Sequence, residues 1–447
     1  MKKTWNPNER ELPMLPNNDN TCGWLTGLPN RPANPALSAD ISADWLIIGA
    51  GYTGLSAARK LAQLQPLDRI VILEANKAGE GASARNSGYL VDSTLNDGHL
   101  SDAGLENFKQ KYELNKLAMD TVREFVNEHR IDCDWNESGK FHATSLEKNE
   151  EKLLNFSSTL TNCGIPHDVM FAEELSRRLG TVYYRAAVRT TGGVLLQPAK
   201  LARAMVERLP LSVELFEQTP VTAWHKSEGT FNVATPKGSV RAKNVLLCTN
   251  GFLPSLGVVA DRAFPLTLTA SLTRPLTDEE FETIGSPGEW GVLSAQAMGA
   301  TVRLTGDRRI MIRNTAEAYN PINMTADTLA KRRQIHFQGL LRRFPFLPSN
   351  AIETTWSGVT CISGNSANIF EKLDDGLFVA GCYNGGGIGL ATLFGEQLAF
   401  KAIGESTVAM EKIEARPQPN WLPPQPFLRW GIKARLMKDR VLATKER

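Results

Sequence analysis

The sequence lacks the patterns of a zinc protein or of a disulfide-rich secreted protein. Its six cysteines, at positions 22, 133, 163, 248, 361 and 382, include no CxxC pair, and its six histidines include no HExxH spacing. We therefore predict no metal site and no dithiol redox motif. In a chain of 447 residues, so few cysteines are typical of free, buried thiols in a reducing compartment.

The chain also lacks long apolar runs and an excess of charge of one sign. No run approaches the roughly 18 apolar residues of a membrane helix. The opening MKKTWNPNER has no apolar stretch of the kind that follows the basic residues of a secretory signal. Fifty basic and forty-eight acidic residues give a net charge of +2, which does not favour nucleic-acid binding. We therefore expect a cytoplasmic protein that binds no nucleic acid.

The length predicts two or three domains. Residues 1–43 are rich in Asn and Pro and lack periodicity, so we expect an N-terminal arm. From residue 45 the stretches WLII, GAGYTG, LSAARKLAQL and RIVILE read as strand, glycine turn, helix and strand. This βαβ unit favours a parallel sheet covered by helices. Further helices are expected at 105–130, 198–209 and 327–344, and a β-meander at 211–247.

Three glycines mark the turn after the first strand. Gly49, Gly51 and Gly54 form GxGxxG, in which the first glycine permits the tight turn, the second lets a pyrophosphate approach the backbone, and the third lets helix and strand pack closely. The helix N-terminus then offers free N–H groups to the phosphates. Glu74 ends the next strand, where a carboxylate accepts ribose hydroxyls and disfavours the 2′-phosphate of NADP. The pattern predicts a dinucleotide site but does not separate NAD from FAD.

A second glycine-rich segment, AGEGASARNSGYL at residues 78–90, follows the carboxylate. Together with WLIIGAGYTGLSAA and the late NGGGIG, it resembles the D-amino-acid-oxidase-like (DAO) family of FAD-dependent oxidoreductases, and within that family the γ-glutamylputrescine oxidase branch. The resemblance covers roughly residues 35–440. It implies FAD as the cofactor and an α/β fold, in which a Rossmann-like FAD-binding domain of the glutathione-reductase type carries an inserted antiparallel-sheet substrate domain.

The implied domains are not continuous in sequence. After the arm, the FAD-binding domain would be gathered from residues 44–100, 195–260 and 350–410. The substrate domain would take residues 101–194 and 261–349. Residues 411–447 would form a C-terminal tail and helix.

The resemblance also implies which positions contact FAD. Val221 in QTPVTAW would meet the adenine through its backbone, and the segment from Ala82 would lie along the pyrophosphate and flavin. The candidate contacts are Gly49, Gly51, Thr53, Gly54, Glu74, Ala82, Ser83, Arg85, Asn86, Ser87, Gly88, Val221, Gly251, Gly358, Gly385, Gly386, Gly387 and Ile388.

The late stretch GLFVAGCYNGGGIGLATLFGE predicts a strand, a glycine loop and a helix that begins near Leu390. A helix N-terminus aimed at flavin N1 and the C2 carbonyl would stabilise the negative charge of the reduced ring. In the family this loop usually reads GxSGHG, and Gly386 stands here at the place of its histidine. Whatever that histidine contributes must come from elsewhere in this chain.

Three residues are candidates for the substrate pocket. Arg313, in the hairpin VRLTGDRRIMIRNT, could hold a substrate carboxylate in bidentate fashion, or be a surface arginine in a salt bridge. Tyr319 and Tyr383 are expected as pocket walls or as half-buried core residues. Cys361 follows Gly358 at a spacing where sarcosine-oxidase-like relatives bond their flavin covalently. A buried inert thiol is the alternative.

The resemblance implies oxidation of the C–N bond of an amine or amino acid. Hydride would pass to flavin N5 and leave an imine, which water hydrolyses. Because this chemistry depends on placement more than on a side-chain base, no catalytic residue is assigned. Oxygen or another acceptor would reoxidise the flavin, and the sequence decides neither this acceptor, nor the substrate, nor the oligomeric state.

Two other functions stay open. The basic segment PFLRWGIKARLMKDRVLATKER could rest on a membrane surface, as part of a dehydrogenase that passes electrons to a quinone. Alternatively, it is a terminal helix packed against the protein. The second function, suggested by the missing loop histidine, is that of an FAD-binding assembly protein without turnover.

Overall fold

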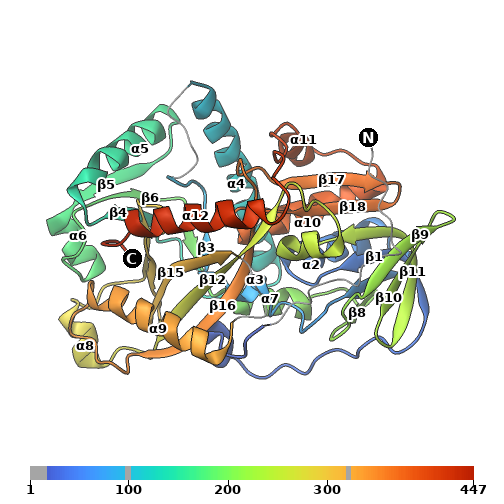
Figure 1. Ribbon diagram of the computed structural model, residues 1–447, viewed down its shortest axis with the longest axis horizontal. Coiled ribbons are helices and arrows are strands. Elements are labelled where there is room, and N and C mark those ends of the chain that lie inside the picture. Colours follow the sequence, from blue (N-terminus) through green and yellow to red (C-terminus); the bar gives the residue numbers. More distant parts are fainter. Residues whose placement is uncertain (1–17, 96–101, 319–323) are drawn as a thin grey trace.

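The computed structural model describes residues 18–95, 102–318 and 324–447. Two eight-stranded sheets organise these residues. Figure 1 shows the first sheet on the right and the second on the left, with long helices between them and across the front.

The first sheet is the one that contains the glycine turn. Its strand order is β17-β18-β11-β1-β2-β8, and β10 and β9 extend it from β11. The neighbours from β18 to β8 run parallel, whereas β17 is antiparallel to β18. The strands are β1 (Ile41–Ile48), β2 (Ile70–Leu73), β8 (Val213–Phe216), β9 (Ala223–Ser227), β10 (Thr230–Thr235), β11 (Gly238–Leu247), β17 (Ile369–Asp374) and β18 (Leu377–Gly381).

Both faces of this sheet are buried, which explains why the second half of β1, from Trp45 to Ile48, and the whole of β2 are apolar. Ile47 packs into the cluster formed with the helices, and its neighbours Leu46 and Ile48 pack into the cluster on the other face. The first cluster contains residues of α2 (Tyr52–Leu64), α4 (Asp102–Glu128), α7 (Pro198–Glu207) and α10 (Gly387–Ile403). The predicted α/β fold is confirmed.

The prediction of a β-meander at 211–247 is wrong for its first strand. β8 does not join β9 and β10; it pairs in parallel with β2 at the edge of the sheet. The reason is that β8 directly follows α7, which covers the sheet, so the chain returns as a parallel strand. Only β9, β10 and β11 form the antiparallel meander.

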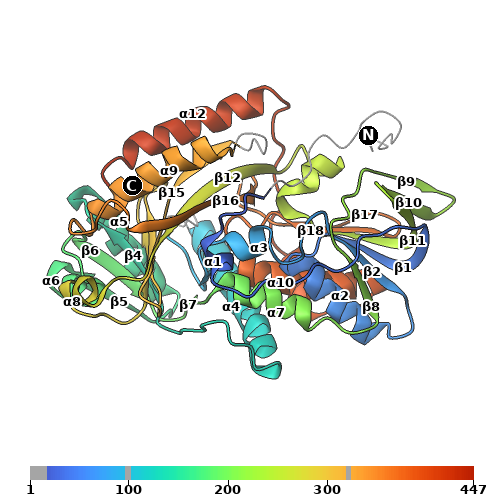
Figure 2. The ribbon, with the colours of Figure 1, turned by 90° about the horizontal axis from the view of Figure 1, so that it is seen from below.

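The second sheet has the order β16-β12-β15-β14-β13-β4-β6-β5. All its neighbours are antiparallel except β13 and β4. α9 (Ala326–Leu341) and α12 (Phe427–Leu442) lie together over β12, β15 and β16 (Figure 2). Its strands are β4 (Lys140–Thr144), β5 (His167–Phe171), β6 (Ala186–Thr190), β12 (Phe264–Thr273), β13 (Trp290–Ser294), β14 (Thr301–Leu304), β15 (Ile310–Ala318) and β16 (Ile352–Ile362).

Shorter elements connect the two sheets and cover their edges. Within the described ranges, no helix combines the length and the apolar character needed to cross a membrane. The remaining elements are α1 (Gly23–Thr26), α3 (Ala82–Arg85), β3 (Tyr89–Leu90), α5 (Glu150–Asn162), α6 (Ala172–Leu179), β7 (Val194–Leu195), α8 (Asp278–Thr283), α11 (Val408–Glu414) and the 3₁₀ turns at Glu147–Asn149 and Asn250–Leu256.

The domain bounds themselves stay a prediction. Strand pairing bears on one of them, because β16 lies within the stretch 350–410 that was assigned to the FAD-binding domain. β16 pairs along its length with β12 and so belongs to the second sheet. We therefore propose that the last FAD-domain segment begins at β17 rather than at residue 350.

Candidate active site

A cavity of about 670 Å³ lies between the two sheets. Its wall is formed by the ends of β1 and β2, the N-terminus of α10, and residues of β4, β12, β13, β14, β15 and β16. The candidate residues that line it are Gly49, Gly51, Thr53, Glu74, Ala82, Ser83, Arg85, Asn86, Ser87, Val221, Arg313, Gly358, Tyr383, Gly385, Gly386, Gly387 and Ile388. Gly54, Gly88 and Gly251 are not part of the wall, and Tyr319 lies outside the described residues.

The GxGxxG turn has the geometry that its glycines predict. Gly49 has a φ of +101°, a conformation that glycine adopts at no steric cost. A Cβ built on Gly54 would overlap the carbonyl oxygen of Gly49, so this glycine serves helix–strand contact rather than the cavity wall. α2 begins at Tyr52 beside the cavity, and the Tyr52 N–H donates to Ser83 Oγ over 3.0 Å. A phosphate group placed there would meet a helix N-terminus and a hydroxyl.

Glu74 closes the same end of the cavity. Its carboxylate accepts the Ala50 N–H over 2.8 Å and the Asn76 N–H over 3.0 Å. Burial raises the pKa of Glu74, and no cation of the described residues forms an ion pair with it. Because a carboxylate has about four acceptor sites, it can still accept ribose hydroxyls. The carboxylate would repel the 2′-phosphate of NADP, because both groups are negatively charged.

At the other side, the N-terminus of α10 faces the cavity without side chains in the way. Gly385 and Gly387 line the wall, and a Cβ built on either would meet no atom within 4 Å. The positive end of the helix dipole therefore faces open space, where it stabilises negative charge. Nearby, the Tyr383 hydroxyl and Thr53 Oγ1 are 2.7 Å apart and both line the wall. These residues fit FAD, which combines phosphates, ribose and a ring that becomes anionic on reduction.

Arg85 was expected beside the cofactor, but its guanidinium is engaged by the N-terminal arm. It donates to the Asp19 carboxylate over 2.9 Å and to the Ser357 carbonyl over 3.1 Å. Asp19 also accepts the Ser357 N–H over 2.8 Å. Burial would raise the pKa of Asp19, yet Arg85 and Ser357 together hold it below its usual value. Asp19 thus connects the segment around α3 to β16, and no motif in the sequence indicated this role.

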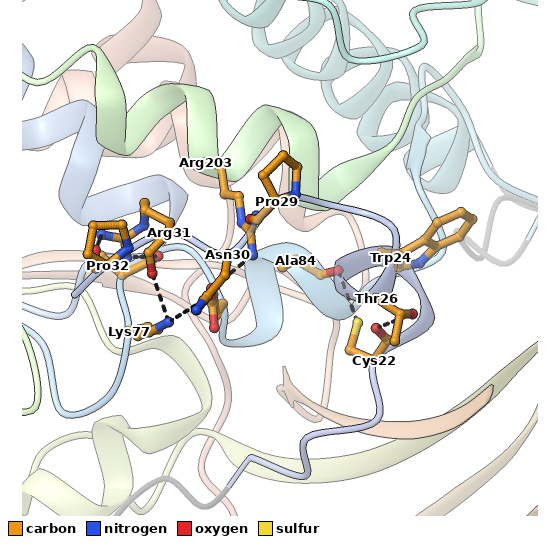
Figure 3. Close-up of polar contacts among 12 residues, drawn as sticks. Cys22, Trp24, Thr26, Pro29, Asn30, Arg31, Pro32, Lys77, Ala84 and Arg203 are labelled. Carbon is orange, nitrogen blue, oxygen red and sulfur yellow. Dashed lines mark hydrogen bonds and ion pairs between the residues drawn. The ribbon is translucent and has the colours of Figure 1, made fainter.

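Figure 3 shows the next part of the arm, from Cys22 to Pro32, which lies alongside the segment that comes after β2 in the chain. Cys22 Sγ contacts the Ala84 carbonyl at 3.8 Å, and Trp24 Nε1 donates to the Asn86 carbonyl over 2.8 Å. Further along, Lys77 Nζ donates to the Arg31 carbonyl over 2.9 Å. The arm therefore supports, from outside, the residues that line the cavity from within.

This arrangement leads to a prediction for Asp19→Asn. Breaking one partner of a buried ion pair costs about 3 kcal/mol, so we expect a lower melting temperature and faster loss of FAD on dilution, followed by flavin fluorescence. Asp120→Asn is the matched control, because it breaks the exposed Asp120–Arg123 pair, and exposed pairs contribute little. Equal FAD retention in both variants would contradict a supporting role of the arm.

Cys361 is a buried thiol that does not line the cavity. The adjacent Cys382 thiol and burial raise the pKa of Cys361 well above its usual value, so it is poorly suited to act as a nucleophile. We expect acid precipitation of the holoprotein to release all yellow colour into the supernatant, and Cys361→Ser to bind FAD normally. Flavin that stays with the precipitate and disappears in Cys361→Ser would show a covalent bond.

Among the polar side chains that the second sheet contributes to the cavity are Arg313 and His142. Arg313 donates to Thr301 Oγ1 over 2.7 Å and pairs with no carboxylate of the described residues, and burial lowers its pKa. His142, on β4, is buried with no partner at Nε2. Burial lowers the pKa of His142 to about 3, so the imidazole is neutral at pH 7. The sequence analysis did not identify His142, since KFHAT contains no motif.

The C-terminal end also supports this wall. The Glu446 carboxylate accepts from Ser294 Oγ over 2.5 Å and from the Ser145 N–H over 3.0 Å, and its carbonyl accepts the Ala300 N–H over 2.8 Å. Ser294 and Ala300 bracket a turn that lines the cavity. Sequence spacing contained no signal for this contact, because it joins residues about 150 positions apart.

Known proteins with similar sequences include oxidoreductases. Residues 44–401 match the DAO family, described as FAD dependent oxidoreductase. The chain is 28% identical over 390 residues to a probable oxidoreductase OrdL of Rhizobium meliloti (strain 1021), covering 85% of this chain and 87% of that protein. It is 26% identical over 379 residues to gamma-glutamylputrescine oxidoreductase of Escherichia coli (strain K12), covering 81% and 84%.

Solved structures share the fold. Glycine oxidase from Geobacillus kaustophilus superposes with a TM-score of 0.70 at 18% identity, covering 82% of this chain and 96% of that one. L-amino acid deaminase from Proteus vulgaris superposes with a TM-score of 0.66 at 17% identity, covering 85% and 97%. With a family match across most of its length, a cavity that fits the cofactor and this shared fold, the chain belongs to the DAO family of FAD-dependent oxidoreductases.

Proposed function

We propose that this enzyme oxidises the C–N bond of an amine or amino acid that also carries a carboxylate. The observation that carries the proposal is Arg313, a half-buried guanidinium at the cavity wall whose one hydrogen bond within the described residues goes to a threonine. A guanidinium binds a carboxylate in bidentate fashion. A substrate carboxylate would give Arg313 the charge partner that it lacks among the described residues.

The distribution of charge in the cavity supports the same substrate class. Glu74, at the dinucleotide end, is the one carboxylate that lines the cavity within the described ranges. A polyamine with several cationic groups would therefore find no anion to replace its hydration, and burying an unpaired cation is costly. Gamma-glutamylputrescine oxidoreductase and glycine oxidase, which resemble this chain in sequence and in fold respectively, take their names from a gamma-glutamyl amine and from glycine. Both names are consistent with an amine that also bears a carboxylate.

The chain's own residues would position the substrate. When bound, FAD supplies the acceptor for the hydride that leaves the carbon next to nitrogen. Arg313 would hold the carboxylate, and the unpartnered Nε2 of neutral His142 offers a hydrogen bond to the amine nitrogen without adding charge. The amine must be neutral before it loses hydride, and a site without a nearby carboxylate favours the neutral amine. The product is an imine, which water hydrolyses after release.

The residues that we propose to contact FAD are the candidates that line the cavity, among them Gly49, Gly51, Glu74 and Ser83. Gly54 would act through packing. The N-terminus of α10 would stabilise negative charge on the reduced ring.

Anaerobic bleaching of the flavin absorbance tests this function. Matched pairs of compounds would be compared, each an amino acid or N-substituted amino acid and its methyl ester or decarboxylated amine. We expect each acid to bleach the flavin at least about a hundred-fold faster than its ester or decarboxylated amine, because the latter two lack the charged partner that hydrogen-bonds Arg313. Faster bleaching by polyamines than by any acid would contradict the proposal.

The same experiment separates the alternatives. If no amine bleaches the flavin, a non-catalytic FAD-binding role in assembly is favoured. If bleaching occurs, peroxide formation in air identifies an oxidase, and its absence identifies a dehydrogenase that uses another acceptor such as a quinone.

A further inference from the structure

The terminal helix α12 has two apolar faces, and only one of them is covered. Leu428 and Leu436 are buried against the protein, and Leu436 also lines the cavity. Figure 2 shows α12 on the outside of the molecule, over the second sheet and beside α9. Burial of the inner face accounts for the packing of the helix against the protein, but it does not account for the apolar residues on the outer face.

The outer face carries a continuous apolar stripe. Phe427, Trp430, Ala434, Met437 and Val441 are all exposed, and their spacing of three and four residues places them on one side of a helix. The large side chains are 61% to 69% exposed. Phe427 and Trp430 contact each other edge to face, with centroids 5.8 Å apart. A stripe of this kind is typical of an interaction surface rather than of scattered surface residues.

Elsewhere in the described chain, exposed large apolar side chains stand on different elements. These side chains are Leu67, Leu154, Phe171, Val182, Leu211, Val408 and Trp421, whereas Leu442 stands on α12 itself. The concentration on one helix therefore requires a specific explanation.

Basic residues border the stripe on both sides. Arg429 and Lys433 follow one edge, and Arg435 and Lys438 follow the other; all four are exposed. The one acidic residue of the helix, Asp439, is paired with Arg435 over 2.9 Å. The stripe thus lies between two rows of positive charge, with one carboxylate to offset them.

We propose that α12 lies flat on an anionic lipid surface, with the stripe residues in the boundary between headgroups and acyl chains. Aromatic and aliphatic side chains on one helix face, with lysines and arginines at the edges, are the features of an interfacial helix. Anionic headgroups complement the charge of both edges. A second copy of the chain would instead bring two sets of like charges together. The inference does not depend on the substrate proposed above.

The test is binding of the FAD-loaded protein to vesicles, measured by flotation. We expect binding to vesicles of phosphatidylcholine mixed with phosphatidylglycerol. Pure phosphatidylcholine or high salt should reduce the partition coefficient at least about tenfold, because the charge contribution is then removed or screened. The double variant Trp430→Ser, Met437→Ser should reduce it by a similar factor and keep its FAD.

Leu67→Ser with Leu211→Ser is the matched control, because both leucines are fully exposed but lie elsewhere; its binding should equal that of the unchanged protein. Three results would overturn the proposal: no binding to the mixed vesicles, equal binding of the α12 variant, or a soluble dimer that light scattering finds in the unchanged protein and not in the α12 variant. As a second readout, brominated lipids should quench tryptophan fluorescence less in the α12 variant than in the control.

Discussion

Gly54→Ala is expected to yield a protein that purifies without FAD. The added Cβ would overlap the carbonyl oxygen of Gly49 and approach Ile47 on β1, and a backbone oxygen cannot rotate away as a side chain does. To accept the methyl group, α2 must move away from β1, which displaces the N–H groups that we propose to face the phosphates of FAD. An overpacking cost of about 3 kcal/mol corresponds to FAD binding weaker by at least about a hundred-fold.

Gly27→Ala is the control for this variant. Gly27 has a φ of −87°, and a Cβ built on it meets no atom within 4 Å, so the added methyl group should change neither FAD content nor stability. The measurement is the ratio of absorbance at 450 nm to that at 280 nm after purification, followed by titration of the apoprotein with FAD. A yellow Gly54→Ala protein with unchanged affinity would show that the turn does not hold the dinucleotide.

Arg313→Met is expected to remove most activity toward carboxylated substrates without harming the fold. Losing a charged, hydrogen-bonded contact costs about 3 kcal/mol, so kcat/KM should fall by about 150-fold. The melting temperature should stay equal or rise, because Arg313 is half-buried and lacks an acidic partner among the described residues, and an unpaired charge of this kind does not stabilise the folded state. Loss of activity with a gain in stability is characteristic of a binding residue.

Two companion variants make the interpretation specific. Arg313→Lys keeps the charge but loses the planar fork, so its kcat/KM should lie between those of the unchanged enzyme and of Arg313→Met. Arg308→Gln, on the exposed hairpin turn where Arg308 pairs with Asp278, should have no effect. A uniform loss of activity toward substrates with and without a carboxylate, or a marked loss of stability in Arg313→Met, would mean that Arg313 is structural.

The proposed dinucleotide end of the site could be assigned from sequence because its contacts are local. Gly49, Gly54 and Glu74 belong to one βαβ unit, in which a strand, a turn and a helix position one another. Spacing alone therefore indicated the carboxylate that accepts the Ala50 N–H. The helix after the last glycine loop was also expected, although α10 begins at Gly387, three residues before the expected Leu390.

The proposed substrate end could be predicted only in part, because the sequence offered Arg313 as a candidate and gave no signal for His142. His142 and Arg313 come from β4 and β15, which are separated in the second sheet by β13 and β14. Sheet order and register decide which residues of such strands meet, and a one-residue shift would turn each side chain to the other face. The contact of Asp19 with Arg85 depends likewise on an arm that no pattern could place.

By itself, the sequence determined the glycine turn and its carboxylate, since these rest on fixed local spacing, and the resemblance of its motifs implied the family and FAD. The sequence also contained both apolar faces of α12, but not which of them the protein covers. Only the tertiary structure decided that Leu436 faces inward while Trp430 faces outward, and that an arginine without an acidic partner among the described residues lines the cavity. Burial and charge pairing depend on neighbours that are remote along the chain, and only folding brings those neighbours together.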